Sequence, residues 1–459
     1  MRYETPARPE GVPPAPLARG LFLSVFLVLA TACTAPPPHG VTPAQGPAPA
    51  DTAPADGISP PPATRDRAPV PLPLLRPGTA AERLARAALA ESDRDSPSRD
   101  LLVQRQQERV ATERRRWPLI APVARVNQDG EAEAGVRATL VLHDFGRSRA
   151  QQARADSAIT LAQLDLWRER IDSTQAVLGH IVDAGAALAL RDASAASMTD
   201  IEALRQIALN RVESGIADQL ELALFDLRLA QLRDEIAADT ALLNLALGQI
   251  ASATGRPEVT APSLAEFAAA FRPAPETGIG VADTAPALLR AQLNQTRAEQ
   301  DLALATARRL PAVQLRGTVT GGDESSSQVA LELETSDFPG FATRPALLAA
   351  RTSLSSARAA VARTIREEEA EANRVALEHA RLDSRMASLT QLEAEARASV
   401  ALFLEQQELG DRPLTDGITV YRTVLGAQRD LIQVRANMLR LRIGDAARTG
   451  LLVGWDGAE

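Results

Sequence analysis

The sequence contains one cysteine, Cys33, and its position indicates covalent modification. Cys33 follows the apolar run LFLSVFLVLATA at 21–32, and three arginines precede that run. A basic start, a short apolar core and small residues before a cleavage point are typical of a secretory signal. We therefore predict that residues 1–32 are a lipoprotein signal peptide and that Cys33 carries an acyl anchor such as palmitate. A plain signal peptide with an incidental cysteine is the alternative.

The other residues that could do chemistry form no catalytic or metal-binding pattern. The four histidines lack partners at the spacing of metal ligands, and the sequence has no P-loop, no dinucleotide-binding fingerprint and no G-x-S-x-G turn. All 50 basic residues are arginine, but 58 acidic residues outweigh them, so the net charge of −8 offers no overall attraction for nucleic acid. We expect no enzyme, no cofactor, no metal site and no nucleic-acid partner.

The segment after the cysteine is rich in proline and alanine. Residues 33–78 hold few large apolar side chains and cannot bury enough surface to form a core. We predict that this segment is a semi-extended tether.

The rest of the chain consists of two copies of one unit, because landmarks recur at a nearly constant offset. Pro118, Phe145, Gly215 and the pair Thr254-Gly255 recur as Pro311, Phe338, Gly410 and Thr449-Gly450. The predicted organisation is a first repeat over 79–255, a linker over 256–283 and a second repeat over 284–454. Such a duplication indicates that both copies fold alike.

Each copy predicts a helix, a β-hairpin, a long helix and a returning helix. The predicted bounds are 80–116, 118–144, 146–213 and 217–254 in the first copy, and 284–309, 311–337, 343–409 and 413–449 in the second. Apolar residues spaced alternately four and three apart give the returning helices a coiled-coil seam. Each long helix would reach about 100 Å, which favours a rod or a tube.

The hairpins carry alternating side chains. Val313, Leu315 and Val319 point one way, and the residues between them are polar. A hairpin packed on a soluble core explains this pattern, and so does a membrane-barrel strand with one face to lipid and one to a lumen. For the barrel we predict that the lumen-facing residues are Gln314, Arg316, Glu332 and Glu334.

Aromatic residues gather at the helix-facing ends of the hairpins. They are Trp117, Phe145, Phe338 and Phe341. A girdle of aromatic residues is typical of a membrane interface, although a second girdle at the opposite ends of the hairpins is missing. Four strands cannot close a barrel, and open edges are not tolerated in lipid, so membrane strands would require several chains to associate.

The duplication, the run LHDFGRSRAQQARADSA after the first hairpin and the glycine turns before helical seams together resemble the outer-membrane efflux protein family, the TolC-like channels. The resemblance covers nearly all of 79–454. It implies a mainly α fold with a membrane β-barrel, twelve-stranded in a homotrimer, and a long periplasmic α-barrel. It also implies an outer-membrane location, an equatorial insertion at 256–283, a periplasmic adaptor and an inner-membrane pump, either proton-driven or ABC-type.

The resemblance further implies a periplasmic gate just beyond the tip turns at Gly215 and Gly410. Arg412 matches the family's gate arginine, Asp416 matches the first gate aspartate, and Glu221 stands at an acidic partner position. Two further positions depart from the family, with Thr419 in place of the second aspartate and Gln407 in place of an aromatic residue. Without the family, Asp416 and Glu221 are explained by the helix dipole.

Two functional hypotheses follow. The first is a lipid-anchored outer-membrane duct, gated at its tip, for small molecules or for secreted polypeptides. The second is a periplasmic coiled-coil lipoprotein with a structural role and soluble hairpins.

Overall fold

The computed structural model describes residues 70–114, 117–126, 132–272, 284–321, 326–334, 343–408 and 413–455. They all belong to the unit Ala68–Glu459, which is separate from Met1–Arg67. The predicted signal peptide, Cys33 and most of the predicted tether lie outside the described residues.

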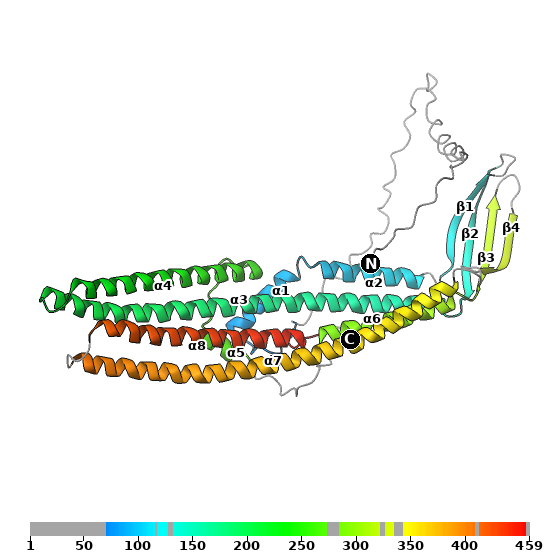
Figure 1. Ribbon diagram of the computed structural model, residues 1–459. Coiled ribbons are helices and arrows are strands. Elements are labelled where there is room, and N and C mark those ends of the chain that lie inside the picture. Colours follow the sequence, from blue (N-terminus) through cyan, green and yellow to red (C-terminus); the bar gives the residue numbers. More distant parts are fainter. Residues whose placement is uncertain are drawn as a thin grey trace, which may run out of the picture. The chain divides into compact units, whose positions relative to one another are not determined.

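The described elements form a mainly α fold with four strands (Figure 1). In chain order they are α1 Ala80–Ser92, α2 Pro97–Arg114, β1 Leu119–Val126, β2 Ala132–His143, α3 Arg147–Glu213, α4 Gln219–Thr254, α5 Leu264–Ala270, α6 Pro286–Ala307, β3 Ala312–Gly321, β4 Ser326–Glu334, α7 Thr343–Glu408 and α8 Thr415–Arg448. The order α2-β1-β2-α3-α4 repeats as α6-β3-β4-α7-α8. The predicted combination of long duplicated helices and two hairpins is confirmed.

Four long helices run alongside one another in the order α4, α3, α8, α7 (Figure 1). Helix α3 has 67 residues and α7 has 66. The inner pair α3 and α8 joins the two copies, and α4 and α7 form the two edges of this layer. Buried aliphatic residues at helical spacing hold the layer together.

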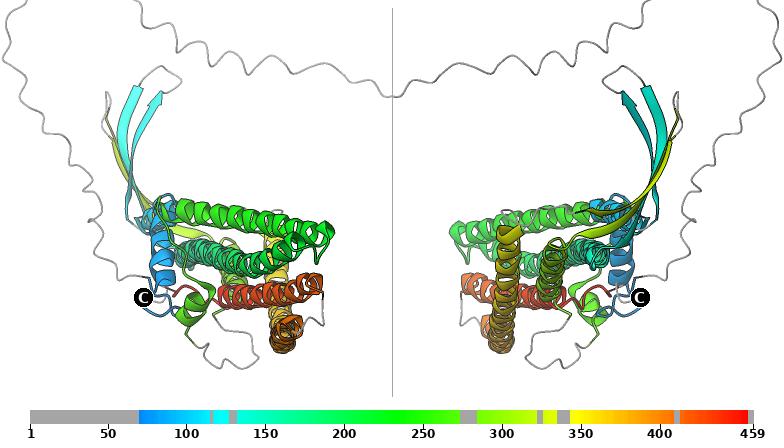
Figure 2. Two further views of the ribbon diagram at one scale, coloured as in Figure 1. Left: turned by 90° about the vertical axis from the view of Figure 1, so that its left-hand side faces the viewer. Right: turned by 90° about the vertical axis from the view of Figure 1, so that its right-hand side faces the viewer.

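The four strands form one antiparallel sheet in the order β1-β2-β3-β4. The two hairpins are joined through β2 and β3, where Leu140 lies opposite Leu315. The sheet stands at one end of the helices and extends away from them (Figure 2). Its two outer strands, β1 and β4, have no strand partner on their far sides in this sheet.

The helix predicted over 80–116 is in fact two helices. The Asp93 carboxylate accepts two hydrogen bonds of 2.9 Å from Arg170 of α3, which fixes the chain where α1 ends. Ser96 then caps α2 with its hydroxyl, and Pro97 is the first residue of α2. Serine followed by proline is a helix-start signal, and our prediction missed it.

The predicted tether over 33–78 is too long at its C-terminal end. Leu72, Leu74 and Leu75 are buried in the core of the helical unit, and Leu75 forms an isolated antiparallel bridge with Phe271. These closely spaced leucines give the end of the segment enough apolar surface to pack. Its described end therefore belongs to the folded body.

The linker predicted over 256–283 contains the short helix α5. Ser263 and Glu266 cap this helix reciprocally, each side chain accepting the other residue's backbone N–H. Phe267 and Phe271 are buried and meet edge to face, with ring centroids 5.1 Å apart. The described part of the linker is thus packed on the helices.

Candidate functional site

The sheet separates its side chains into an apolar and a polar face. Residues directly opposite in an antiparallel register share a face. The apolar face includes Ile120, Val136, Leu140, Leu315, Val319, Val329, Leu331 and Leu333. The predicted alternation therefore continues across β2, β3 and β4, whereas β1 is largely apolar on both faces, with Leu119 opposite Thr139 on the polar side.

The apolar face is exposed. Val329 is 78% exposed, Leu331 67% and Leu333 68%, and Ile120 on the other edge strand is 69% exposed. A hairpin packed on a soluble core would bury this face. The arrangement therefore counts against the soluble packed hairpin, because a contiguous exposed apolar surface marks contact with a partner or a membrane.

The polar face brings the four predicted lumen residues together in pairs. Arg316 Nη1 lies 2.5 Å from Glu332 Oε1, and the Gln314 amide donates a hydrogen bond to the Glu334 carboxylate. Gln314 is only 8% exposed, whereas its neighbour Leu315 is 37% exposed. In this part of β3 the polar side chain is therefore the more buried one, which is the reverse of a soluble sheet.

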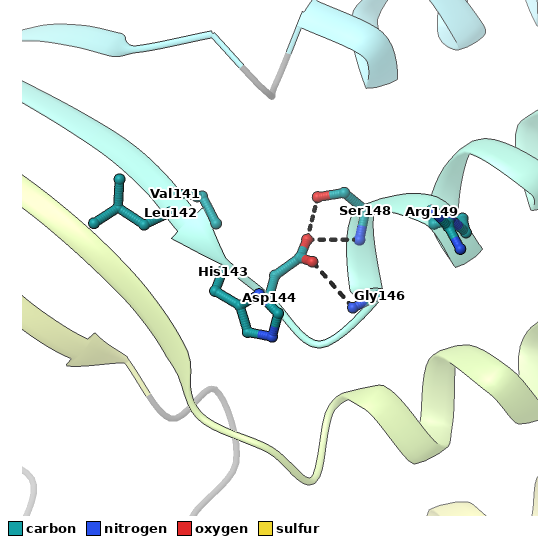
Figure 3. A pocket seen from close by; sticks show the side chains of 7 residues that line it. All are labelled: Val141, Leu142, His143, Asp144, Gly146, Ser148 and Arg149. Atoms are coloured by element: carbon teal, nitrogen blue, oxygen red, sulfur yellow. Dashed lines mark hydrogen bonds between the residues drawn. The ribbon is translucent and has the colours of Figure 1, made fainter.

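The turn from β2 into α3 is held by Asp144 (Figure 3). Its carboxylate accepts hydrogen bonds from the backbone N–H of Gly146 at 3.2 Å and of Ser148 at 2.7 Å, and from the Ser148 hydroxyl. Burial disfavours ionisation of Asp144, but these hydrogen bonds outweigh it and hold the pKa of the carboxyl below its usual value. Gly146 has φ 88°, a left-handed conformation that favours glycine. The sequence LHDFGRS is thus explained by a capped strand-to-helix turn.

Two of the four predicted interfacial aromatics lie at the described end of the sheet. Trp117 is 74% exposed just before β1, and Phe145 is 44% exposed just after β2. Phe145 also meets His143 edge to face, with centroids 4.4 Å apart. The predicted residues Phe338 and Phe341 lie outside the described residues.

At the far end of the helices, Gly215 makes the turn from α3 to α4. It has φ 72°, and its N–H donates to the carbonyl of Val212 at 2.9 Å. The N–H of Ile216 donates to the carbonyl of Arg211 at 2.8 Å. This pair of bonds is a Schellman motif, which ends the long helix and satisfies its last carbonyls.

The predicted gate acids both lie in first turns of helices. Glu221 is half-buried in the first turn of α4, and Asp416 is exposed in the first turn of α8. Acids at these positions are favourable for the helix dipole whatever else they do. Gly410 and Arg412 lie outside the described residues, so their relation to Asp416 stays a prediction.

A compact apolar cluster, the tip core, supports this end of the helices. Its buried members are Ile201, Leu204, Ala208, Phe225, Leu229, Leu232, Phe403, Leu414 and Leu425. Gly417 lies against this tip core: a Cβ there would stand 2.8 Å from both Leu204 Cδ1 and Phe403 Cζ. Any larger residue at this position would force the side chains of Leu204 and Phe403 to shift.

Neither Asp144 nor Gly417 was predicted from the sequence to be a functional or structural key residue. Asp144 stood inside a motif that we quoted, and its position two residues before a glycine at a helix start was a capping signal. Gly417 gave no signal, since its role depends on side chains from two other helices. Within the part of the chain that the structure describes, no group of three metal-ligating side chains occurs.

The chain matches no known family model in sequence, and no curated protein matches it. Solved structures, in contrast, match its fold. The outer membrane protein VceC from Vibrio cholerae is 14% identical, with 82% of this chain and 97% of that chain covered and a TM-score of 0.70. The outer-membrane channel OprN is 17% identical, with 87% and 99% covered and a TM-score of 0.71. The chain has the fold of the outer-membrane channels.

A third structure with this channel fold is the MtrE outer membrane channel of Neisseria gonorrhoeae in its open state. It is 14% identical, with 84% of this chain and 93% of that chain covered and a TM-score of 0.66. The channel fold confirms the single-chain fold expected from the resemblance to TolC-like proteins, with long duplicated helices and two β-hairpins, and the homotrimer stays a prediction. At these identities the likeness shows the fold, and function is a separate question.

Proposed function

We propose that the protein is an outer-membrane exit duct of a tripartite efflux or secretion system, a passive conduit rather than an enzyme. The observation that carries this proposal is the sheet, whose apolar face is exposed and whose polar side chains pair with one another on the opposite face. In a membrane barrel the first face would meet lipid and the second would line the lumen. The channel fold supports the same function, since the similar chains VceC and OprN are an outer membrane protein and an outer-membrane channel.

The duct requires several copies of the chain. The outer edges of β1 and β4 present unpaired backbone groups, which lipid does not satisfy. A homotrimer pairs each β4 with a neighbour's β1 and closes a twelve-stranded barrel. The same association covers the exposed leucines of edge helix α4, among them Leu242 at 54% and Leu245 at 60% exposure. By length and composition α4 is apolar enough to span a membrane, and contact with a neighbouring chain accounts for that composition as well.

The tip is the proposed docking and gating end. In this proposal Arg412, Asp416 and Glu221 form the gate, and three converging copies of Asp416 make a carboxylate ring that favours cations. An adaptor protein joins the tip to an inner-membrane pump, and the acylated Cys33 adds a lipid anchor. Acylation by itself leaves the cargo open between small molecules and polypeptides.

Crosslinking from the tip in cells tests this function. A photoreactive residue replaces Ile216, which is 70% exposed beside the Gly215 turn, and a second variant carries it near Gly410. Amine-reactive reagents are unsuitable because the chain has no lysine. Crosslinks to an adaptor that co-purifies with a proton-driven pump support an efflux duct. Crosslinks to an adaptor that co-purifies with an ABC transporter support a secretion duct. Crosslinks to peptidoglycan or unrelated soluble proteins alone would replace the duct with the tethered structural rod.

A further inference from the structure

The helix-facing end of the sheet carries an unusual concentration of positive charge. We define the arginine collar as the arginines, among the described residues, that lie within ten residues of a strand end on its helical side. Its members are Arg109, Arg114, Arg147, Arg149, Arg308, Arg309 and Arg344. In the sequence, these four ten-residue stretches hold nine arginines and three carboxylates. The remainder of the chain has 41 arginines against 55 carboxylates, so the collar is basic in an otherwise acidic protein.

Most of the collar arginines are exposed to solvent and have no carboxylate partner among the described residues. Arg114, Arg149, Arg308, Arg309 and Arg344 are exposed, and none of them forms an ion pair with a carboxylate of the described residues. They come from four different passages of the chain, which the sheet brings to one end of the helices (Figure 1). Elsewhere on the helices arginines commonly pair with acids, as Arg374 does with Glu371 at 2.5 Å.

Two collar arginines are already engaged. Arg109 binds Asp156 and Glu113, and Arg147 donates to the carbonyl of Leu310 at 3.2 Å. The second contact ties the start of α3 to the approach of β3 and so fixes two passages of the collar against each other.

Apolar side chains lie directly beside the free arginines. Trp117 and Arg114 line one shallow pocket, and Leu310 beside Arg309 is 45% exposed. Leu142, Asp144 and Arg149 line a second pocket of about 420 Å³ at the turn into α3 (Figure 3). An exposed aromatic or aliphatic group with an arginine next to it matches the boundary between lipid chains and head groups, where long cationic side chains extend to the phosphates.

The opposite end of the sheet has the reverse charge. The hairpin loops 127–131 and 322–325 contain four acidic residues and no arginine. Arg125 lies near the loop end of β1, but the collar concentrates the arginines at the helical end of the sheet. A negatively charged lipid surface is therefore attracted more strongly to the helical end.

We propose that the arginine collar binds anionic phospholipid head groups of the leaflet nearest the helices, and thereby fixes the depth of the sheet in the membrane. The inference rests on the proposed membrane location of the sheet. A guanidinium group binds a phosphate group well, because the two can form a pair of parallel hydrogen bonds. The attraction is electrostatic and weakens as salt screens it.

The test uses the full-length protein reconstituted in phosphatidylcholine with a trace of spin-labelled phosphatidylglycerol or spin-labelled phosphatidylcholine. The measured quantity is the motionally restricted fraction of each label. We expect at least about a threefold preference for phosphatidylglycerol, falling toward equality in high salt. The preference should be lost when Arg114, Arg149, Arg308 and Arg309 are replaced by glutamine.

A matched variant replaces four exposed arginines remote from the sheet with glutamine, namely Arg233, Arg256, Arg366 and Arg422. It should keep the preference. Equal restriction of both lipids by the wild type, or a preference that survives in the collar variant, overturns the collar proposal while leaving the membrane sheet intact. Absence of any restricted lipid would instead overturn the proposed function. Circular dichroism confirms that each variant is folded.

Discussion

Arg429 of α8 reaches past α3 and binds Asp239 of α4. Its guanidinium nitrogens lie 2.7 and 3.2 Å from the two carboxylate oxygens, and it also donates to the hydroxyl of Ser194 on α3 at 2.8 Å. The Asp239 side chain is only 4% exposed, and Ser194 is buried. One side chain of the second repeat thus fastens both long helices of the first.

We predict that Asp239→Ala destabilises the protein by about 1–3 kcal/mol, because it removes the closest carboxylate from a partly buried guanidinium and leaves it the more distant Glu235, 3.9 Å away. Arg429 is 29% exposed, which keeps the expected cost below that of a fully buried pair. Chemical denaturation measures the change. The control Glu371→Ala removes an exposed ion pair on α7 and should cost less than about 0.5 kcal/mol. Equal losses of stability in the two variants would show that the Asp239 contact contributes no more than an exposed ion pair.

The glycines of α8 give a second prediction. Gly417→Ala should destabilise the tip core by about 1–3 kcal/mol, since the new methyl group would overlap Leu204 and Phe403. Gly426→Ala in the same helix meets open space and should stabilise by about 0.5–1 kcal/mol. Amide exchange around the tip core distinguishes the two. Faster exchange in both variants, or in neither, would show that the close approach at Gly417 is unimportant.

The pKa of Asp144 predicts a pH dependence at the strand-to-helix turn. Because the pKa of the folded carboxyl is lowered, its stabilising effect is present above the unfolded value and is lost as the pH falls through the folded value. Asp144→Ala should therefore cost about 0.5–2 kcal/mol near pH 7 and progressively less below about pH 4. The readout is amide exchange at the start of α3.

The control for that prediction is Asp172→Ala, an exposed acid in the interior of the same helix. Asp172→Ala should have little effect on amide exchange at the start of α3 at any pH. A cost of Asp144→Ala that is unchanged at pH 3 would mean that the charged form of the cap contributes nothing.

The exposed leucines of α4 predict the assembly. Leu242→Glu combined with Leu245→Glu should reduce the trimer fraction at least about tenfold, because each leucine buried in an interface contributes about 1.5–3 kcal/mol. Native mass spectrometry in detergent measures the fraction. Val103→Glu on α2, where the valine is 50% exposed, is the control and should leave assembly unchanged. A trimer that withstands the double substitution would exclude the α4 face from the interface.

The sequence predicted the repeated elements well because each depends on local pattern. Alternation in 313–320 and the glycine at 215 each specify a local structure over a few residues. The break before Pro97 was missed although its signal was also local. The contact between Arg429 and Asp239 could not be predicted, since the two residues are 190 positions apart and meet only through the packing of three helices.

The proposed duct requires that the sheet lies in a membrane with its apolar face toward lipid. The most direct measurement is a nitroxide scan of residues 328–333 in β4, one labelled cysteine at a time in a Cys33→Ala background, with the protein reconstituted in lipid. We predict that labels at 329, 331 and 333 collide with dissolved oxygen, and that labels at 328, 330 and 332 collide with a water-soluble nickel complex. Uniform access of the nickel complex to all six positions, with no alternation, would show that the apolar face of the sheet does not face lipid.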